Sequence, residues 1–383
     1  MERTMTASRH YVLAAGGTGG HMVPAHALGA ELIARGHSVA LVTDERGARI
    51  PGLFEGMATH VMPAGRIAGG PIGWLRAGRS ILAGRAMARG LNRQVRPSAV
   101  IGFGGYPALP ALLAALKDGV PAMVHEQNAI LGRVNRLLAG RVDIIATAYP
   151  DVQRLKPAHA GKVRLVGNPV RKEVLALRDE PFPALTEDGQ FRVLVTGGSQ
   201  GATILSTVVP DGLGLLPLGL RRNLKVVQQC RPEDIEDVRR RYAELGIDAE
   251  LATYMQDMPD RLRWSQLVIA RAGASTIAEL TVAGRPAILI PLPSAMDDHQ
   301  TANVVEIVDA GGARAIVQSV FTPVELAKQI QKLAGEPGAL AEAAARMREC
   351  GRPDAASALA DVVESYGVTV RETAPAPRGS VYA

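Results

Sequence analysis

The feature that most constrains the fold is a glycine-rich stretch near the start of the chain. Gly16-Gly17-Thr18-Gly19-Gly20-His21 follows an apolar run at 11–15 and precedes a helical pattern that ends near Gly36. The order strand, glycine loop, helix is typical of α/β proteins. Glycines let backbone N–H groups curl around an anion, and the following helix directs its positive dipole end at the same point. The stretch therefore predicts a phosphate-binding loop, with close helix–strand packing as the alternative reason for its glycines.

Two familiar nucleotide-binding motifs do not fit this loop. No Lys-Ser or Lys-Thr pair closes it as in a P-loop, and its glycines lack the G-x-G-x-x-G spacing of the dinucleotide fingerprint. Asp44 ends the second apolar run, at 37–43, and an acidic residue there could hold a ribose hydroxyl as in nicotinamide enzymes. Because the fingerprint is broken, the dinucleotide interpretation is disfavoured.

Length and composition indicate a globular protein of two domains. A chain of 383 residues exceeds one ordinary core, and 47% hydrophobic with 21% charged residues is a soluble balance. No apolar run approaches the ~18 residues that span a bilayer, and the polar first ten residues are no secretory signal, so we expect a cytoplasmic protein. Cys230 and Cys350 lie too far apart in the sequence to indicate a disulfide framework or a zinc site.

Positive charge is concentrated in one block of the first half. Between Gly56 and Lys117 there is no Asp or Glu, and the eight basic residues of this block exceed the net charge of +6 of the whole chain, so the remainder is net negative by two. Such a block indicates an anionic partner: nucleic acid, a membrane surface or a phosphorylated substrate. Nucleic acid is disfavoured because aromatic residues make up 4% of the chain and no stacking cluster accompanies the arginines.

The segment 70–96 within this block has the pattern of an amphipathic helix. Such a helix could dock on an anionic bilayer, with Trp at the interface and Arg on phosphates, or it could pack on its own domain. The absence of acidic residues favours the membrane. The apolar stripe and the arginines that continue the same face are Trp74, Leu75, Ile81, Leu82, Arg85 and Arg89.

Two more strand-to-helix turns follow in the first half. The apolar run at 99–103 leads into Gly104-Gly105-Tyr106-Pro107, and the run at 121–124 leads into His125-Glu126-Gln127-Asn128. Ligands of open parallel sheets bind beyond the carboxyl ends of the strands, so these turns and the first glycine loop should face one crevice. Their polar side chains are site candidates on position alone.

The architecture restarts in the second half. Strand patterns at 144–147 and 163–166 are followed by Gly167-Asn168-Pro169-Val170-Arg171, where we place the domain boundary. The run at 191–195 then leads into a second glycine loop, Thr196-Gly197-Gly198-Ser199-Gln200-Gly201-Ala202. The chain therefore looks like two similar α/β halves.

Further turns and a terminal segment complete the second half. A strand pattern at 267–270 feeds Arg271-Ala272-Gly273-Ala274-Ser275-Thr276-Ile277-Ala278-Glu279-Leu280, and Asp297-Asp298-His299-Gln300 opens a helical pattern at 302–309. Helical patterns continue near the end of the chain, the last of them at 355–366. The final residues contain Pro, Ala and Ser and predict a disordered tail.

Seven of these motifs, in this order, resemble the MurG family of glycosyltransferases over residues 9–367. They are GGTGGH, GGYP, HEQN, GNPVR, GGSQGA, RAGASTIAEL and DDHQTANV. The resemblance implies the GT-B fold, an α/β fold of two Rossmann-like doubly wound domains facing a cleft. It implies an N-terminal acceptor- and membrane-binding domain at 1–168 and a C-terminal domain at 169–352 that binds the UDP-sugar. We expect the helix at 355–367 to pack back on the first domain and residues 368–383 to be disordered.

The implied activity is an inverting transfer in peptidoglycan synthesis. N-acetylglucosamine would move from UDP-N-acetylglucosamine to the C4 hydroxyl of an undecaprenyl-linked muramyl-pentapeptide, giving lipid II. The implied setting is peripheral, at the cytoplasmic face of the bacterial inner membrane, with an anionic membrane surface and other cell-wall enzymes as partners and without a cofactor. The alternatives are a related GT-B enzyme, such as a two-domain epimerase or a transferase using another UDP-sugar or lipid acceptor, and a basic peripheral membrane-binding protein.

The resemblance assigns the donor site to the second half. Ser199 with Gly198, and the turn Ala274-Ser275-Thr276, are the implied diphosphate contacts. Glu279 resembles the acid that holds the ribose hydroxyls, although Thr276 and Glu279 also fit a capping box that only closes the helix start. Further implied contacts are Arg171 with phosphate, Gln300 and Asn128 with the sugar, and the backbone of Met255 with uracil. His299 stands where the family has another glutamine, and the loop before it is one residue longer.

The first half would then bind the acceptor. Thr18, Gly19 and Gly20 are left for its pyrophosphate, and the second glycine turn contributes Gly104, Gly105 and Tyr106. His21 is the candidate base for the hydroxyl proton, because an imidazole titrates near working pH; a role in positioning the acceptor phosphate is the alternative. His125 and Glu126 compete for the base. No aspartate-x-aspartate clamp follows a strand, so we expect transfer without a metal ion.

Overall fold

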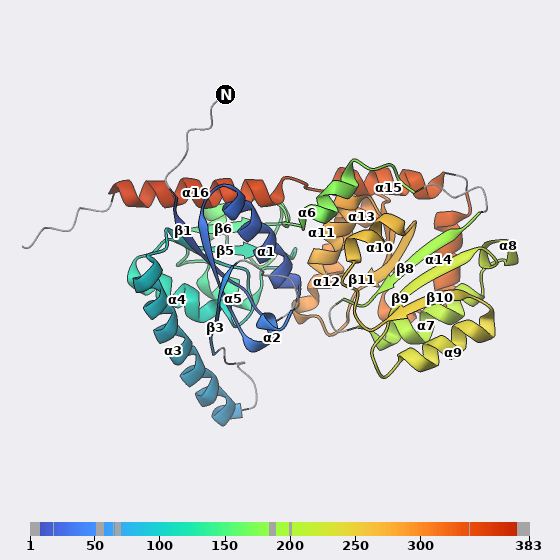
Figure 1. The fold of residues 1–383 in the computed structure, drawn as a ribbon, viewed down its shortest axis with the longest axis horizontal. Helices are drawn as coiled ribbons and strands as arrows, with labels where there is room; N and C mark the ends of the chain where they lie inside the picture. The colour runs from blue at the N-terminus through green and yellow to red at the C-terminus, as the bar shows by residue number, and fades with distance from the viewer. Residues whose placement is uncertain are drawn as a thin grey trace, which may run out of the picture.

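The computed structural model describes residues 8–17, 19–50, 57–63, 65, 70–183, 189–198, 201–336 and 338–373. Two parallel sheets organise it, as the alternation of strand and helix patterns predicts (Figure 1). The first sheet has seven strands in the order β3-β2-β1-β4-β5-β6-β7, and the second has six in the order β10-β9-β8-β11-β12-β13. Both orders reverse once, between β1 and β4 and between β8 and β11, which makes both sheets doubly wound and confirms the predicted fold class.

The elements of the first sheet and its helices are β1 His10–Ala14, α1 Gly19–Ala34, β2 Ser38–Thr43, α2 Glu45–Ala48, β3 Ala58–Val61, α3 Gly70–Val95, β4 Ala99–Gly102, α4 Ala108–Asp118, β5 Ala122–Glu126, α5 Arg133–Leu138, β6 Ile144–Thr147, η1 Pro157–Lys162 and β7 Val163–Leu165. Edge strand β3 is absent from the sequence prediction, because its side chains are largely exposed and carry no apolar pattern.

The elements that follow β7 are α6 Lys172–Leu175, η2 Ala176–Arg178, β8 Phe191–Thr196, α7 Thr203–Gly214, α8 Leu218–Arg221, β9 Leu224–Gln229, α9 Ile235–Leu245, β10 Asp248–Ala252, α10 Met258–Trp264, β11 Leu267–Arg271, α11 Ala274–Ala283, β12 Ala287–Ile290, η3 Met296–Asp298, α12 His299–Asn303, α13 Val305–Asp309, β13 Ala313–Ala315, η4 Gln318–Val320, α14 Pro323–Ala334, α15 Ala339–Cys350 and α16 Ala355–Thr373.

Helices cover both faces of each sheet. In the first domain, α3, α4 and α5 pack on one face, while α1 and α16 pack on the other. In the second, α7, α9 and α14 cover one face, and α6, α10, α11, α13 and α15 cover the other. The strands alternate between these two cores, so they are apolar on both sides and read as continuous apolar runs.

The last helix returns to the first domain. Figure 1 shows α16 running along the N-terminal sheet and α1, although it follows the C-terminal domain in sequence. Arg35, directly after α1, forms ion pairs with Asp361 at 2.6 Å and Glu364 at 2.8 Å, and Leu359 lies in the first domain's core. The helix extends to Thr373, six residues beyond the expected end at 367, and residues 374–383 lie outside the described residues; the disordered tail stays a prediction.

Candidate functional site

A cleft of about 880 Å³ lies between the two domains. The loops after β1 and β5 in one sheet and after β8 and β11 in the other line it, because the carboxyl ends of both sets of strands face the same space. Of the residues predicted from the sequence, the cleft wall contains Gly19, Gly20, His21, Asn128, Arg171, Met255, Ala274, Ser275, Thr276, Glu279 and Gln300.

A smaller pocket of about 150 Å³ adjoins this cleft on the N-terminal side. The predicted residues Gly104, Gly105, Tyr106 and Glu126 line it, and His21 lines both spaces. The cleft and the pocket therefore meet at His21. Predicted residues Thr18 and Ser199, and the side chain of Trp74, lie outside the described residues.

The first glycine loop is held by contacts within its own domain. A Cβ on Gly16 would lie 2.5 Å from Cγ of Pro107, so the loops after β1 and β4 touch only because this residue is glycine. Gly17 has φ 85° and donates its N–H to Oδ1 of Asp44 at 3.1 Å. Asp44 also caps α2 through the N–H of Gly47. Close packing thus accounts for Gly16, and Asp44 occupies one amide of the predicted anion loop.

Helix α11 presents its amino end to the cleft. Gly273 is the N-cap residue and makes no side-chain capping bond, and Ser275 donates its hydroxyl to the carbonyl of Gly20 across the cleft at 3.2 Å. The alternative of a Thr276–Glu279 capping box is wrong, because the helix begins before Thr276. The first-turn N–H groups and the helix dipole make this end suitable for an anion.

Glu279 pairs with Arg171 inside the cleft. The Arg171 guanidinium donates to Oε1 of Glu279 from Nε at 2.9 Å and from Nη2 at 2.7 Å. Burial raises the pKa of the Glu279 carboxyl, and the charge and hydrogen bonds of Arg171 oppose that rise. The sequence predicts separate contacts to ribose and phosphate for these residues, and the structure places the two side chains together.

Two further arginines of the cleft wall were missed from the sequence. Arg231 follows β9, and Arg271 ends β11. Arg271 donates from Nη2 to Oε1 of Gln318 at 2.7 Å, and burial, together with the charge of Arg231, lowers its pKa. Their positions at the carboxyl ends of strands could have identified both. With Arg171 they make this side of the cleft positive.

His21 faces the cleft from the first turn of α1. Its Nδ1 lies 3.1 Å from Oε1 of Gln127, and its ring packs on the second glycine turn, where a Cβ on Gly104 would lie 3.2 Å from Cε1. Burial lowers the pKa of His21; Gln127 and Glu126 oppose this, and His299 lowers it further. A neutral imidazole at the junction of two cavities is suited to accept a proton.

The two competing base candidates are held by other contacts. The Glu126 carboxylate accepts four N–H groups, from the backbone and side chain of Asn128, the backbone of Gly132 at 2.7 Å and the side chain of Asn135 at 2.9 Å. His125 is fully buried, and its Nε2 donates to the carbonyl of Gly167 at 2.9 Å. Burial lowers the pKa of His125 to about 4. These contacts fix the loop after β5.

The segment 296–303 joins the two domains. Asp297 accepts hydrogen bonds from Arg136 and Arg154 of the N-terminal domain, both at 2.5 Å. Asn303 accepts from the backbone N–H of Ala129 at 2.9 Å and donates to Oδ1 of Asn128 at 3.1 Å. These long-range contacts have no signal in the sequence.

The same segment holds the predicted sugar contact. Asp297 and Asp298 have φ of 59° and 55°, a left-handed conformation that is unusual for residues other than glycine. Directly after them, His299 lines both cavities, and the Gln300 side chain accepts from the N–H of Leu292 at 3.0 Å. The ion pairs of Asp297 thus fix the turn that places Gln300.

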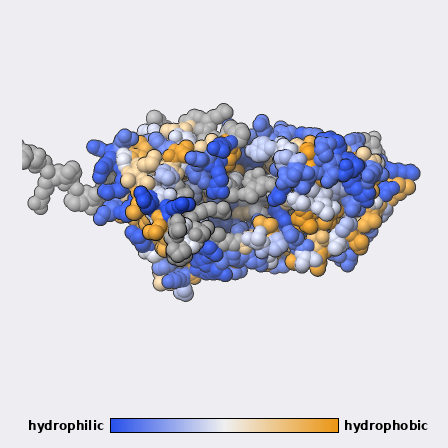
Figure 2. Space-filling model, turned by 90° about the horizontal axis from the view of Figure 1, so that it is seen from below, coloured by the Kyte–Doolittle hydropathy of each residue, from blue (hydrophilic) through white to orange (hydrophobic). Residues whose placement is uncertain are grey.

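Helix α3 packs on its own domain with one face and exposes apolar residues on the other. Ala77, Gly84, Ala88 and Leu91 are buried against the domain, whereas Leu75 and Leu82 are 70% and 64% exposed. Figure 2 shows apolar and hydrophilic residues intermixed over the half of the molecule that carries this helix.

Two members of the predicted membrane-facing stripe make contacts within their own domain. Ile81 packs against the core, because it lies on the buried side of the helix. Arg89 donates from Nε to Asp118 of α4 at 2.7 Å, so its charge joins two helices. Arg85 is half-buried.

The described part of the chain contains neither a bilayer-spanning helix nor a metal cluster. No described helix is long and apolar enough to cross a membrane. Among the same residues, no group of three or more His, Cys, Asp and Glu side chains is placed to hold a metal ion.

Two doubly wound domains with glycine loops facing a shared cleft define a GT-B glycosyltransferase. The chain belongs to glycosyltransferase family 28: residues 11–147 match the family's N-terminal domain and residues 192–359 its C-terminal domain. A relative from Zymomonas mobilis subsp. mobilis is 64% identical over 95% of this chain and 94% of its own length. It is named UDP-N-acetylglucosamine--N-acetylmuramyl-(pentapeptide) pyrophosphoryl-undecaprenol N-acetylglucosamine transferase.

A further relative and two solved structures also match this chain over most of its length. A relative with the same name, from Novosphingobium aromaticivorans, is 65% identical over 95% of this chain and 94% of its own. The crystal structure of a MurG from Acinetobacter baumannii matches with a TM-score of 0.73 and 29% identity over 93% of this chain and 99% of that one. The glycotransferase of kitacinnamycin, at 17% identity and a TM-score of 0.68 over 94% of this chain and 100% of that one, shares the fold.

Proposed function

We propose that this enzyme transfers N-acetylglucosamine from UDP-N-acetylglucosamine to an undecaprenyl-pyrophosphoryl muramyl-pentapeptide, the step of peptidoglycan synthesis that gives lipid II. Full-length relatives at 58–65% identity carry the name of this activity. The observation that carries the proposal is the cleft, which brings an arginine-lined wall and a histidine-lined pocket together at His21.

The C-terminal wall of the cleft is the proposed donor site. The amino end of α11 and the Arg171 guanidinium offer N–H donors and positive charge to a diphosphate. Glu279 would bind the ribose hydroxyls, so donor binding would exchange the Arg171–Glu279 pair for phosphate and ribose contacts. Met255 and Gln300 line the same space and remain the proposed contacts of uracil and sugar.

The pocket beside His21 is the proposed acceptor site. It opens where the turn Gly104-Gly105-Tyr106 packs against the His21 ring, and its space of about 150 Å³ suits part of a sugar. A muramyl C4 hydroxyl there would lie between the donor sugar and the imidazole. The lipid pyrophosphate would follow toward Gly19 and Gly20, at the amino end of α1.

The proposed reaction is a single inverting displacement. The acceptor oxygen attacks the anomeric carbon of N-acetylglucosamine, its proton passes to Nε2 of His21, and the bond from the anomeric carbon to the UDP oxygen breaks. Arg171 and the α11 dipole stabilise the negative charge that develops on UDP. We propose that no metal ion takes part, and loss of transfer on chelation with recovery on adding a divalent ion would contradict this.

A direct assay tests the proposal. Labelled N-acetylglucosamine should pass from its UDP donor to a lipid-linked muramyl-pentapeptide, and labelled glucose from UDP-glucose should pass far less. Equal transfer of both sugars would favour a transferase with another donor, and binding of UDP-N-acetylglucosamine without transfer would favour another reaction. A Glu342→Gln enzyme, altered at an exposed residue of α15 outside the cleft and both pockets, is the control for handling losses.

We propose that the enzyme meets its lipid substrate at the cytoplasmic face of the inner membrane through α3. Leu75 and Leu82 lie four and three residues from Arg79 on one exposed helix face, a combination suited to an anionic bilayer. Flotation with anionic liposomes should fall for a Leu75→Ser/Arg79→Gln/Leu82→Ser variant and persist for Leu165→Ser, which alters an exposed leucine elsewhere. Equal flotation would remove this surface from the proposal. Other cell-wall enzymes remain proposed partners.

A further inference from the structure

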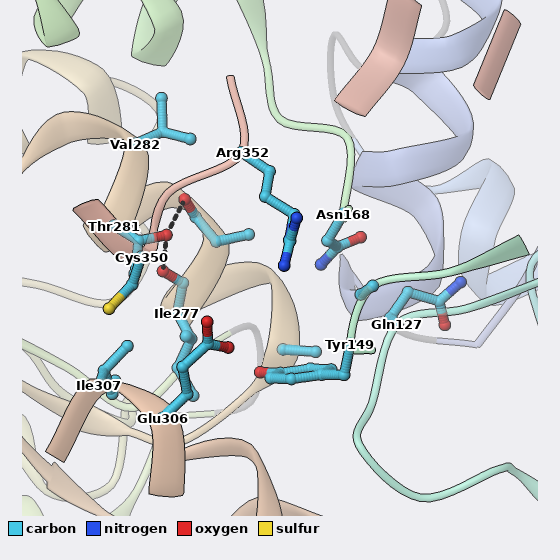
Figure 3. A pocket seen from close by; sticks show the side chains of 13 residues that line it. Gln127, Tyr149, Asn168, Ile277, Thr281, Val282, Glu306, Ile307, Cys350 and Arg352 are labelled. Atoms are coloured by element: carbon cyan, nitrogen blue, oxygen red, sulfur yellow. Dashed lines mark hydrogen bonds between the residues drawn. The ribbon is translucent and has the colours of Figure 1, made fainter. Parts of the chain in front are cut away.

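Gln127 occupies the point where the cavities of the molecule meet. Its side chain is 1% exposed, and it lines the cleft, the acceptor-side pocket and a small hinge pocket of about 40 Å³ between the two domains. Figure 3 shows Gln127 beside Asn168, the residue at which the chain leaves the first domain, with Arg352 of the returning segment nearby. The glutamine therefore connects the domain crossing to the site.

Both ends of the Gln127 amide contact a histidine. Oε1 lies 3.1 Å from Nδ1 of His21, and Nε2 lies 2.9 Å from Nδ1 of His125 and 3.0 Å from the His125 carbonyl oxygen. His125 continues the series, because its Nε2 lies 2.9 Å from the carbonyl oxygen of Gly167. Three hydrogen bonds thus run from His21 to the start of the domain crossing.

The donor and the acceptor of each hydrogen bond in this series can be assigned by starting from the Gly167 carbonyl. A carbonyl oxygen only accepts, so Nε2 of His125 carries the proton and Nδ1 of this neutral ring accepts. The Gln127 NH₂ group then donates to that nitrogen and to the His125 carbonyl, which turns Oε1 toward His21. Oε1 also only accepts, so Nδ1 of His21 carries the proton. In a neutral ring, Nε2 of His21 is then the nitrogen without the proton.

We propose that Gln127 is a positioning residue that holds His21 as the Nδ1–H tautomer, with His125 fixing the Gln127 amide from the Gly167 carbonyl. The consequence for transfer, that Nε2 receives the acceptor proton, rests on the proposed function. The tautomer of His21 does not rest on the proposed function, so an experiment can overturn either one without the other.

The charged surroundings of His21 set the background for a pH test. Glu126 from the end of β5 and His299 from the start of α12 are the charges that act on its pKa, and a hydrogen bond with the backbone of Phe103 raises that pKa. Tyr106, Arg133 and Asp297 line the same pocket.

Nitrogen NMR of the intact enzyme tests the tautomer without any assay of transfer. With ¹⁵N-labelled histidine, the His21 signals are assigned by their loss in His21→Gln. At a pH where His21 is neutral, Nδ1 should be the protonated nitrogen and Nε2 the bare one. A bare Nδ1, or a mixture like that of an exposed histidine, would overturn the proposal. In Gln127→Leu the fixed tautomer should give way to a mixture, and in Gln228→Leu, which removes another buried glutamine, it should persist.

Kinetics test the consequence for the reaction. Gln127→Leu should lower kcat by about tenfold or more, but by no more than the ~10²- to 10⁴-fold that the general base itself supplies, with the KM for UDP-N-acetylglucosamine unchanged. Gln127→Glu keeps an acceptor for Nδ1–H and should restore much of kcat. Its carboxylate favours imidazolium, so the rise of kcat with pH should move to higher pH.

Failure of the positioning role of Gln127 and failure of the proposed function give different experimental results. An unshifted pH profile in Gln127→Glu, or kcat unchanged in Gln127→Leu, would overturn the positioning role. Absence of transfer by the wild-type enzyme would overturn the proposed function, and the NMR tautomer would still decide the inference.

Discussion

The two glycine loops occupy equivalent places in the two domains and have different neighbours. Each follows the first strand of its sheet at the point where the strand order reverses. Beside the loop after β1 lie the carboxylate of Asp44, which binds the N–H of Gly17, and the imidazole of His21. Beside the loop after β8 lies Arg231, whose Cγ would be 2.8 Å from a Cβ on Gly201.

This difference shows that topology places a loop, while the side chains around it select its ligand. In the first loop the Asp44 carboxylate already binds the N–H of Gly17, which leaves the amino end of α1 for an acceptor phosphate, whereas the arginines around the second loop favour the nucleotide diphosphate. We therefore assign proton transfer to the N-terminal domain and the nucleotide to the C-terminal domain. Variants on the two sides should change different kinetic constants.

Replacing His21 should have the largest effect. In His21→Ala, kcat should fall by ~10²- to 10⁴-fold because the acceptor hydroxyl loses its base. The KM for UDP-N-acetylglucosamine should change little, since the donor contacts lie in the other domain. Steady-state kinetics against both substrates measure this. An undiminished kcat with weaker acceptor binding alone would remove His21 from the chemistry.

Replacing Glu279 should change the KM for the donor and leave kcat nearly unchanged. In Glu279→Gln, the KM for UDP-N-acetylglucosamine should rise by ~10- to 100-fold, because hydrogen bonds to a charged group contribute about 1.5–3 kcal/mol. The same kinetic series, with Glu342→Gln on the exposed face of α15 as control, measures it. If kcat falls while KM stays constant, the division of labour between the domains is wrong.

Acid should destabilise the enzyme through His125. The folded pKa of His125 is about 4 and the ordinary value is 6.5, so between these values the unfolded chain binds more protons. Stability contributed by this group is complete above about pH 6.5 and falls by ~1.4 kcal/mol per pH unit down to about pH 4. Urea unfolding at several pH values should show a shallower slope for His125→Gln. Equal slopes would show that His125 is not held neutral.

The Asp297 contacts should have the smallest effect. Asn tolerates the left-handed backbone, so Asp297→Asn removes the charge while keeping the turn. The KM for the donor should rise about two- to fivefold, as expected for a partly exposed ion pair, because Gln300 follows this turn. Asp298→Asn, at the next left-handed position, is the matched control. Equal effects of the two variants would show that the pairs with Arg136 and Arg154 do not act on the site.

The sequence was sufficient for the fold and the location of the site. Alternating strands and helices specify doubly wound sheets, and the motifs at strand ends meet because parallel strands share one carboxyl edge. Short edge strands such as β3 and β13 escaped prediction, because they carry few buried apolar residues. The start of α11 was also misread, because Thr276 and Glu279 have capping-box spacing inside a helix that begins earlier.

Contacts between distant residues were beyond sequence reasoning. The pairing of Arg171 with Glu279 joins residues 108 positions apart, and Asp297 with Arg136 joins residues 161 apart. The buried side of α3 depends on small residues such as Ala77 and Ala88, which an apolar stripe does not reveal. Gln127 stood within a recognised motif, but its role follows only from the two histidines placed on either side of its amide.

A crystal structure of the enzyme with UDP would show which of the two domains binds the nucleotide. We expect the diphosphate at the amino end of α11 beside Arg171, with the Glu279 carboxylate turned from Arg171 to the ribose hydroxyls. A diphosphate bound in the first glycine loop, at Gly16 to Gly20, would contradict the assignment of the nucleotide to the C-terminal domain.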